Sequence, residues 1–472
     1  MPAARRRLAA GLVELSPLLS DLGERFAAGG HELALVGGPV RDLLLGRELP
    51  DVDLTTDARP EVVRELVRDW ADTRWDVGIA FGTVGARKGD TVVEITTYRD
   101  EIYRSASRKP EVTYGDTLEA DLVRRDFTVN AMAVRLPSHE FVDPHGGLID
   151  LADGVLRTPG RAEDSFTDDP LRMMRAARFA AQLGLRVDPT VVDAMTAMAD
   201  RIEIVSAERV RDELTKLLLA PDPRTGLGLL VSTGLAAHML PELPMLALEI
   251  DEHHRHKDVY EHTLTVLEQA IALEREGPDL VLRMAALLHD VGKPRTRRFE
   301  PGGGVSFHHH EVVGAKLARA RLRALRYPKD VVEDVATLVE LHLRFHGYGT
   351  GAWTDSAVRR YVADAGPLLP RLHQLTRSDC TTRNRRKAAA LSASYDDLEA
   401  RIARLREREE LDAIRPDLDG NAIMELLGVP PGPVVGRAWA FLKELRLEQG
   451  PLDRDSAEAA LLAWWATQSD RP

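Results

Sequence analysis

The chain shows two successive patterns of apolar and polar positions. Between about residues 31 and 155, short β-branched runs are broken by Gly, Pro and Asp; examples are ELALVGG, DVDLTT, TVVEITTYR and FTVNAMAV. Such runs predict short strands. From about residue 160 onward, apolar residues recur with the 3.6-residue period of helices. The pattern therefore predicts an α+β fold in which a small mixed sheet is followed by an almost wholly helical remainder.

The N-terminal apolar stretch predicts a surface helix rather than a signal peptide. Its leucines follow the three- and four-residue spacing of one helix face, at Leu8, Leu12, Leu15, Leu19 and Leu22. Charged residues and a proline interrupt this stretch. A membrane-spanning helix needs about 20 apolar residues, and no run of that length occurs. We therefore expect no membrane association.

Length and charge narrow the class of protein only slightly. With 472 residues the chain is too long for one core, and two to four domains are expected. The single cysteine, Cys380, excludes an internal disulfide framework and favours the reducing cytoplasm. A net charge of −12 argues weakly against nucleic-acid binding. Because the basic residues are clustered, RNA remains a compatible partner.

The segment LVGGPVRDLLLGRELPDVDLTT carries the first chemical pattern. Gly37 and Gly38 precede a predicted helix, so the backbone there can approach a phosphate and offer it free N–H groups. Arg41 is placed to reach a triphosphate. Asp51 and Asp53 alternate on a predicted strand and therefore share one face, roughly 6.6 Å apart.

Two carboxylates so placed can bind Mg²⁺ while nucleotide phosphates bind its other side. Glu94, in the strand VVEITTYR, is a candidate third carboxylate. A D-x-D pair alone is usually a solvated strand end. Combined with G-G-x-V-R-D at this spacing, it indicates metal-dependent nucleotidyl transfer.

This combination resembles the first motif of the polymerase-β-like nucleotidyltransferases, in the class II group of CCA-adding enzymes and bacterial poly(A) polymerases. The other motifs of the group follow in order between about residues 120 and 220, as DLVRRDFTVNAMA, DPHGGLIDL, DDPLRMMRAARF and SAERVRDELTKLL. The resemblance implies tRNA as substrate, CTP and ATP as nucleotide donors, and magnesium as cofactor.

A predicted helix carries a charged residue at every third position, at Asp169, Arg172, Arg175 and Arg178. At this spacing the four side chains are spread over one broad face of the helix. The resemblance implies that Asp169 and Arg172 read the incoming base without a template. A carboxylate accepts from the amino group that cytosine and adenine share, and an arginine donates to ring acceptors. Asp168 stands where the family more usually has Glu.

The resemblance implies further nucleotide contacts. Arg175 and Arg178 look like triphosphate ligands. The second motif supplies expected contacts to sugar and phosphates, at Arg124, Arg125, Asp126 and Asn130. Taken singly, each of these residues could equally form an ordinary surface ion pair.

A second constellation lies in the helical part, where RMAALLHDVGKP ends an apolar run with His-Asp. It resembles the HD phosphohydrolase domain. The resemblance implies one or two divalent metals of unspecified identity, bound by His262, His289, Asp290 and Asp379, with His310 and His342 at a second metal. His310 is preferred to its neighbours His308 and His309 because of its HE-x-x-GA context. The HD domain implies phosphatase or phosphodiesterase activity.

These observations predict four parts: an N-terminal helix and catalytic head (1–155), a base-reading neck (156–245), an HD body (246–390) and a helical tail (391–472) that contacts tRNA. The predicted activity is CCA addition to tRNA 3′ ends. Two alternatives stay open: a poly(A) polymerase or enzyme adding only C or only A, and an HD phosphohydrolase with a nucleotide-sensing head. The difference among the transferases is expected in a loop at 101–117.

Overall fold

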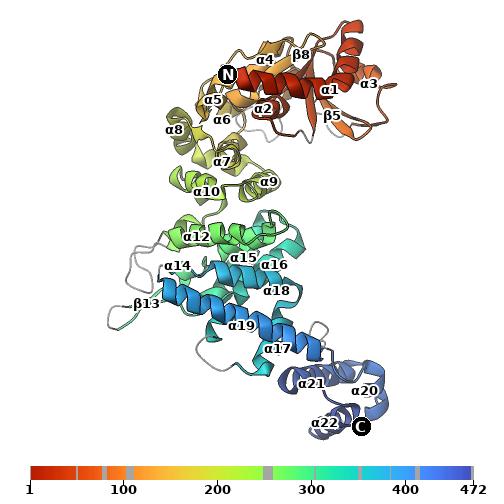
Figure 1. Ribbon diagram of the computed structural model, residues 1–472, viewed down its shortest axis with the longest axis vertical. Coiled ribbons are helices and arrows are strands. Elements are labelled where there is room, and N and C mark those ends of the chain that lie inside the picture. The colour runs from red at the N-terminus through yellow and green to blue at the C-terminus, as the bar shows by residue number, and fades with distance from the viewer. Residues whose placement is uncertain are drawn as a thin grey trace. The chain divides into compact units, whose positions relative to one another are not determined.

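The computed structural model describes residues 2–48, 51–76, 82–102, 111–247, 259–301, 304–348, 353–382, 384–409 and 415–468. The chain divides into two compact units, Met1–Pro241 and Glu242–Pro472 (Figure 1). The first contains a mixed sheet and helices, and the second is helical apart from one short hairpin. The predicted α+β class is confirmed, while the finer division into four parts remains a prediction.

The first unit is organised around one seven-stranded sheet with the order β3-β4-β5-β2-β1-β8-β9. Its strands are β1 (Leu33–Val36), β2 (Val52–Thr56), β3 (Thr73–Trp75), β4 (Thr83–Lys88), β5 (Thr91–Thr97), β8 (Ala133–Leu136) and β9 (Phe141–Val142). Only β2 and β5 pair in parallel; the other neighbours are antiparallel. A separate antiparallel pair is formed by β6 (Arg99–Ile102) and β7 (Glu111–Tyr114).

Helix α1 (Pro2–Ala28) covers one face of this sheet (Figure 1). Its leucine stripe packs against alternate residues of the central strands, including Leu35, Leu54 and Ile95. Four of the five predicted leucines are buried and Leu15 is half-buried. The predicted amphipathic helix is therefore confirmed.

The opposite face of the sheet holds Asp53 and Thr55 of β2. Ala34 and Val36 of β1 pack there against α4 (Leu118–Val123). Because neighbouring strand residues point to opposite faces, Asp53 lies away from α1, between the buried Val52 and Leu54. The head thus buries one face of β2 and leaves its carboxylate on the other.

The run FTVNAMAV differs from the predicted strand. Thr128–Asn130 form a 3₁₀ turn, and β8 begins only at Ala133. The Asp126 carboxylate explains the turn, because its Oδ1 accepts both the Phe127 backbone N–H and the Asn130 side-chain amide. Such local side-chain bonds compete with strand pairing.

The helices that follow the head complete the first unit. They are α5 (Gly147–Asp153), α6 (Ala162–Asp168), α7 (Leu171–Leu183), α8 (Pro189–Ala197), α9 (Ala207–Leu218), α10 (Pro223–Ser232) and α11 (Leu235–Met239). Helix α7 packs against both α9 and α10. At the α10 contact, a Cβ on Gly226 would lie 2.7 Å from the carbonyl oxygen of Ala177.

The second unit is a helical body with a small terminal bundle. The body contains α12 (Val259–Ala272), α13 (Leu280–Leu288), α14 (Lys293–Thr296), α15 (His310–Ala324), α16 (Lys329–Leu341), α17 (Asp355–Ala365), α18 (Leu369–Ser378) and α19 (Arg385–Glu409). Strands β12 (Arg298–Phe299) and β13 (Val305–Ser306) form its hairpin. The helices α20 (Gly420–Leu427), α21 (Pro433–Gln449) and α22 (Arg454–Ala466) enclose a separate apolar core. Within the described residues, no helix is long and apolar enough to cross a bilayer.

Candidate active sites

The parallel pairing of β2 with β5 places two of the predicted carboxylates side by side. Asp53 and Glu94 are direct Cα partners in that register. Asp51 lies one residue before β2 and is exposed. Burial raises the pKa of Asp53, and the charges of Glu94 and Asp51 raise it further, against a lowering by Arg125. The three carboxylates therefore share one anionic patch on the open face of the sheet.

This patch is open rather than a closed cage of ligands. In the described part of the chain, only two groups of three acidic, His or Cys side chains bring their ligand atoms within 4.8 Å of one another, and both lie in the second unit. An open pair of carboxylates leaves room for oxygens of a bound triphosphate on the same cation.

The double-glycine turn lies at the start of α2 (Gly38–Leu45). Gly37 has φ 76°, a conformation that favours glycine, and a Cβ there would lie 2.9 Å from Nη1 of Arg125. Arg41 is buried and donates from Nη1 to Asn130 Oδ1 at 2.6 Å and from Nε to Asp42. Both cations border the turn, because a Cβ on Gly38 would lie 3.7 Å from Nη2 of Arg41.

Asp121, which sequence reasoning did not single out, orients the two arginines of the second motif. Arg124 donates to its Oδ1 and Arg125 to its Oδ2, at 2.6 and 3.0 Å. Burial opposes ionisation, but the two guanidinium groups hold the pKa of Asp121 below its ordinary value. A buried carboxylate with both oxygens occupied fixes both cations.

Asp126 connects the second motif to α7. Its Oδ2 accepts from Nε and Nη2 of Arg175, at 2.8 and 2.5 Å. Burial would raise the pKa of Asp126, but Arg175 and Asn130 together lower it to about 2. The carboxylate therefore stays ionised and anchors Arg175 to the head.

The predicted base-reading pair lies where α6 ends and α7 begins. Asp168 is the last residue of α6, and Asp169 caps that end. Asp169 accepts from the Leu171 backbone N–H at 3.1 Å and from Arg209 Nη2 at 2.7 Å. Arg172 donates to Ser165 Oγ at 2.8 Å and to the Arg124 carbonyl at 2.6 Å. Both side chains are thus fixed by neighbours.

Arg178, predicted as a triphosphate ligand, is buried on α7. It donates from Nε to Glu213 at 2.6 Å and from Nη1 to Gln182 at 2.8 Å. Its guanidinium lies 4.0 Å from the centre of the Phe179 ring. The structure therefore gives Arg178 a protein partner, and its contact with nucleotide stays a prediction.

Sequence reasoning missed three supporting residues, Asp121, Arg209 and Glu213. All three lie inside motifs already recognised. Glu213 is buried on the apolar face of α9, beside Leu214 and Leu217. A carboxylate on an apolar helix face is a signal for a buried ionic partner, and this signal could have identified Glu213.

In the second unit, all six predicted HD residues meet in one cluster, of which four are buried and His262 and Asp379 are half-buried. His262 Nε2 lies 3.0 Å from Asp379, and His289 Nε2 lies 3.2 Å from Asp290. His310 Nε2 lies 3.3 Å from the other oxygen of Asp290. The cluster divides into two groups of three, His262–His289–Asp379 and Asp290–His310–His342.

The histidines of this cluster are oriented as metal ligands usually are. The Nδ1 atoms of His289, His310 and His342 bond backbone carbonyls at 2.6–2.8 Å. Their Nε2 atoms are buried, and those of His289 and His310 lie near Asp290, but none of the three makes a hydrogen bond of good geometry among the described residues. Outer-shell bonds at Nδ1 with free Nε2 atoms are typical of bound metal. The residues present therefore fit one or two divalent ions.

The pKa values of the cluster's histidines shift in opposite directions: burial acts to lower the pKa of His289, but the charges of Asp290 and Asp379 raise it. Burial lowers the pKa of His342 to about 3, so its imidazole is neutral and can ligate a metal. Asp290 also accepts from Lys293 Nζ at 2.9 Å. His308 and His309, by contrast, are exposed. The structure thus brings His310, and not its two neighbours, to the cluster.

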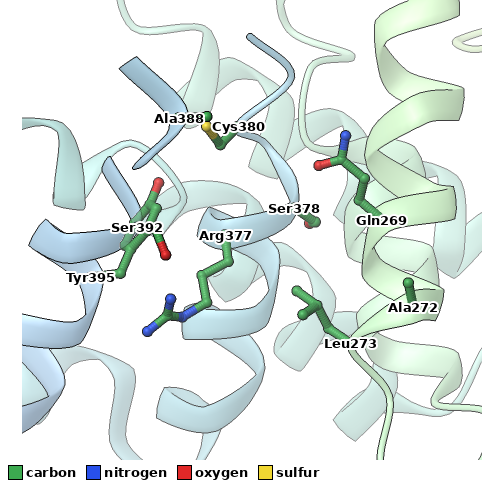
Figure 2. Close-up of a pocket in the computed structure, with 9 residues that line it drawn as sticks. All are labelled: Gln269, Ala272, Leu273, Arg377, Ser378, Cys380, Ala388, Ser392 and Tyr395. Carbon is green, nitrogen blue, oxygen red and sulfur yellow. The ribbon is translucent and has the colours of Figure 1, made fainter. Parts of the chain in front are cut away.

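A cavity of about 370 Å³ lies beside this cluster (Figure 2). Gln269 and Ala272 of α12, with Leu273 directly after the helix, form one wall, and Ser378 and Cys380, which flank Asp379, form another. Arg377 lines it as well, although its guanidinium is bound to Asp396 and Glu399.

Comparisons with known proteins agree with both sites. Residues 33–157 match the poly(A) polymerase head domain, residues 184–246 the probable RNA and SrmB-binding site of polymerase A, and residues 259–405 the HD domain. A head of this kind joined to an HD domain defines a class of metal-dependent nucleotidyltransferases.

Two relatives extend over nearly the whole chain. The A-adding tRNA nucleotidyltransferase of Deinococcus radiodurans is 35% identical, and the match covers 92% of this chain and 96% of the relative. The CC-adding tRNA nucleotidyltransferase of Thermus thermophilus is 34% identical, and the match covers 91% of this chain and 93% of the relative. The structure of the Bacillus stearothermophilus CCA-adding enzyme with CTP matches with a TM-score of 0.67 and 26% identity over 96% and 98% of the two chains. The chain belongs to the tRNA nucleotidyltransferase family.

Proposed function

We propose that this protein completes the 3′ ends of tRNAs by adding C, C and A from CTP and ATP, without a template. The observation that carries the proposal is the β2–β5 register, which sets Asp53 beside Glu94 on the open face of the sheet. Membership of the tRNA nucleotidyltransferase family supports tRNA as the substrate. We propose that this nucleotide addition takes place in the cytoplasm.

In this mechanism, Asp51 and Asp53 would hold Mg²⁺, and the bound ion would supply positive charge to the leaving pyrophosphate and to the attacking 3′-hydroxyl. Glu94 adds charge at the same patch. The turn at Gly37 and Gly38 brings backbone N–H groups to the triphosphate. Arg125, held by Asp121 next to Gly37, contributes a fixed positive charge.

Asp169 and Arg172 select the base. The Asp169 carboxylate accepts from the amino group of cytosine or adenine, and Arg172 donates to a ring acceptor. Uracil and guanine present a carbonyl where this carboxylate requires a donor, so both are rejected. The contacts of Asp169 with Arg209 and of Arg172 with Ser165 keep the two side chains in position.

The HD cluster is proposed to hydrolyse phosphate esters at damaged RNA ends. The two groups of three ligands would hold divalent metal, which supplies a reactive hydroxide at neutral pH. Lys293, bound to Asp290, adds a positive charge at the edge of the cluster. This activity would be a natural companion to 3′-end synthesis.

The alternative candidate is an enzyme adding only CC or only A. It is favoured by the two relatives that span nearly the whole chain, since one is A-adding and the other CC-adding. Part of the loop at 101–117, which is expected to separate these activities, lies outside the described residues, at 103–110.

Extension assays on two acceptors decide among these functions. A tRNA transcript lacking its last three nucleotides and one lacking only the final A would be incubated with Mg²⁺ and each nucleotide singly, or with CTP and ATP together. We expect two additions with CTP alone on the first, and one with ATP on the second. Addition to only one of the two acceptors would identify a partial-adding enzyme. Long adenosine tails would identify a poly(A) polymerase. No extension of either acceptor would favour an HD hydrolase with a nucleotide-sensing head.

A further inference from the structure

A short basic segment leads away from the HD cluster. It consists of the described residues 293–301 and 304–306, which contain α14 and the paired strands β12 and β13, and is called the basic hairpin. Lys293 at its start contacts Asp290 at 2.9 Å. Arg295, Arg297 and Arg298 follow within five residues. In Figure 1 the hairpin projects from the helices of the second unit.

The three arginines carry uncompensated charge. Across the described ranges, none of them is paired with a carboxylate. In the adjacent α15, by comparison, Arg319 and Arg323 both bind Glu333. The Nε of Arg297 is buried and has no hydrogen-bond partner there. In a chain with a net charge of −12, three unpaired arginines in one hairpin indicate an anionic ligand.

Phe299 provides a second kind of contact on the same hairpin. Its side chain is 72% exposed although it is a large apolar group. The Arg297 guanidinium lies 4.9 Å from the centre of the ring. With two residues in each strand, the hairpin has no core that would require a phenylalanine. An exposed ring among cations is the arrangement that binds single-stranded nucleic acid by stacking and phosphate contact.

We propose that the basic hairpin binds the single-stranded 3′ end of an RNA and presents its terminal phosphate to the HD cluster. Arg295, Arg297 and Arg298 contact successive phosphates, and Phe299 stacks on a base. A lone aromatic ring favours RNA over a lipid surface, which would need several exposed apolar side chains. The inference rests on the proposed HD function and names its substrate class.

The test uses the full-length protein and a 5′-fluorescein oligoribonucleotide that ends in a 3′-phosphate. Binding is measured by anisotropy at several salt concentrations, and phosphate release is measured from the same oligonucleotide and from p-nitrophenyl phosphate. The variants are R295Q/R297Q/R298Q and Phe299→Ala. The control R319Q/R323Q/R25Q removes the same charge from arginines that are paired with Glu333 and Asp21.

For the triple variant we expect the slope of log affinity against log salt to fall by about 2, since each single-strand phosphate contact contributes about 0.7. Phe299→Ala should weaken binding about fivefold or more. In both, kcat/KM should fall for the oligonucleotide and stay unchanged for p-nitrophenyl phosphate. The control variant and tRNA extension by all variants should match the wild type.

An unchanged salt slope in the triple variant overturns the proposal, as does binding to anionic phospholipid vesicles without binding to the oligonucleotide. If the wild type releases phosphate from neither substrate, the proposed HD hydrolysis fails. Loss of oligonucleotide binding in the triple variant would then still support the hairpin as an RNA site, because binding is measured independently of hydrolysis.

Discussion

At the scale of single residues, carboxylates decide where the arginines of the nucleotide site point. Asp121 holds Arg124 and Arg125, Asp126 holds Arg175, and Glu213 holds Arg178, each through short charged hydrogen bonds. Removing one partner of a buried pair leaves the other charge unpaired, which costs about 3–5 kcal/mol. The carboxylates are therefore as important for the site as the cations that they orient.

Asp126 makes this pairing measurable through pH. Its folded pKa of about 2 lies below the ordinary 3.8 because Arg175 and Asn130 outweigh the effect of burial. The resulting stabilisation, roughly 2 kcal/mol, is present above pH 4 and is lost as pH falls through about 2. In urea unfolding, the stability difference between wild type and Asp126→Asn should shrink over that interval. The exposed carboxylate variant Asp153→Asn should show no such change; a constant difference for Asp126→Asn would contradict the pairing.

Arg209 is predicted to be a positioning residue for base selection. It binds the Asp169 carboxylate at 2.7 Å, so Arg209→Gln should leave Asp169 less well oriented toward the base. We expect the ratio of kcat/KM for CTP to that for UTP to fall about tenfold, since one good polar contact discriminates by 1–3 kcal/mol. Arg211→Gln, on the same helix, is the control. Equal losses for both nucleotides would show that Arg209 has only a structural role.

At the scale of elements, the contact of α7 with α10 depends on Gly226, where a Cβ would lie 2.7 Å from the Ala177 carbonyl. Gly226→Ala must displace α7, which carries Arg175 and Arg178. We expect a loss of about 1–3 kcal/mol in unfolding free energy and slower nucleotide addition.

Gly228, on the same helix, has open space at its Cβ. Gly228→Ala should therefore raise stability by up to about 1 kcal/mol through helix propensity. Urea unfolding measures whether stability falls in Gly226→Ala and rises in Gly228→Ala, and tRNA extension rates measure whether only the first variant adds nucleotides more slowly. Equal effects at positions 226 and 228 would refute the close approach of α7 and α10.

The sequence predicted elements better than it predicted their pairing. The leucine stripe of α1 and the strands around Asp53 and Glu94 follow from local periodicity. The parallel β2–β5 register joins segments far apart in the chain, and no local pattern encodes it. For the same reason, Asp126 could not be assigned to Arg175, and Glu213, although recognisable as a buried carboxylate, could not be paired with Arg178. The turn at Thr128–Asn130 was missed because Asp126 and Asn130 override a β-branched run.

At the scale of the whole molecule, the two units carry separate chemistry. The head carboxylates lie in Met1–Pro241, and the HD cluster lies in Glu242–Pro472. The HD residues were assigned from a resemblance. The structure adds that the Nδ1 atoms of His289, His310 and His342 are held by backbone carbonyls, while their Nε2 atoms face the cluster. Each unit should therefore lose its own activity independently of the other.

The most direct test compares Asp53→Asn with Asp290→Asn on one tRNA transcript that lacks its last three nucleotides. With CTP, ATP and Mg²⁺, the wild type and Asp290→Asn should both add three nucleotides at similar rates. Asp53→Asn should lose addition by about a thousandfold, because metal-bound charge stabilisation is worth several kcal/mol. Phosphate release from a 3′-phosphorylated oligoribonucleotide should be lost in Asp290→Asn and retained in Asp53→Asn. Full CCA addition by Asp53→Asn would contradict the account.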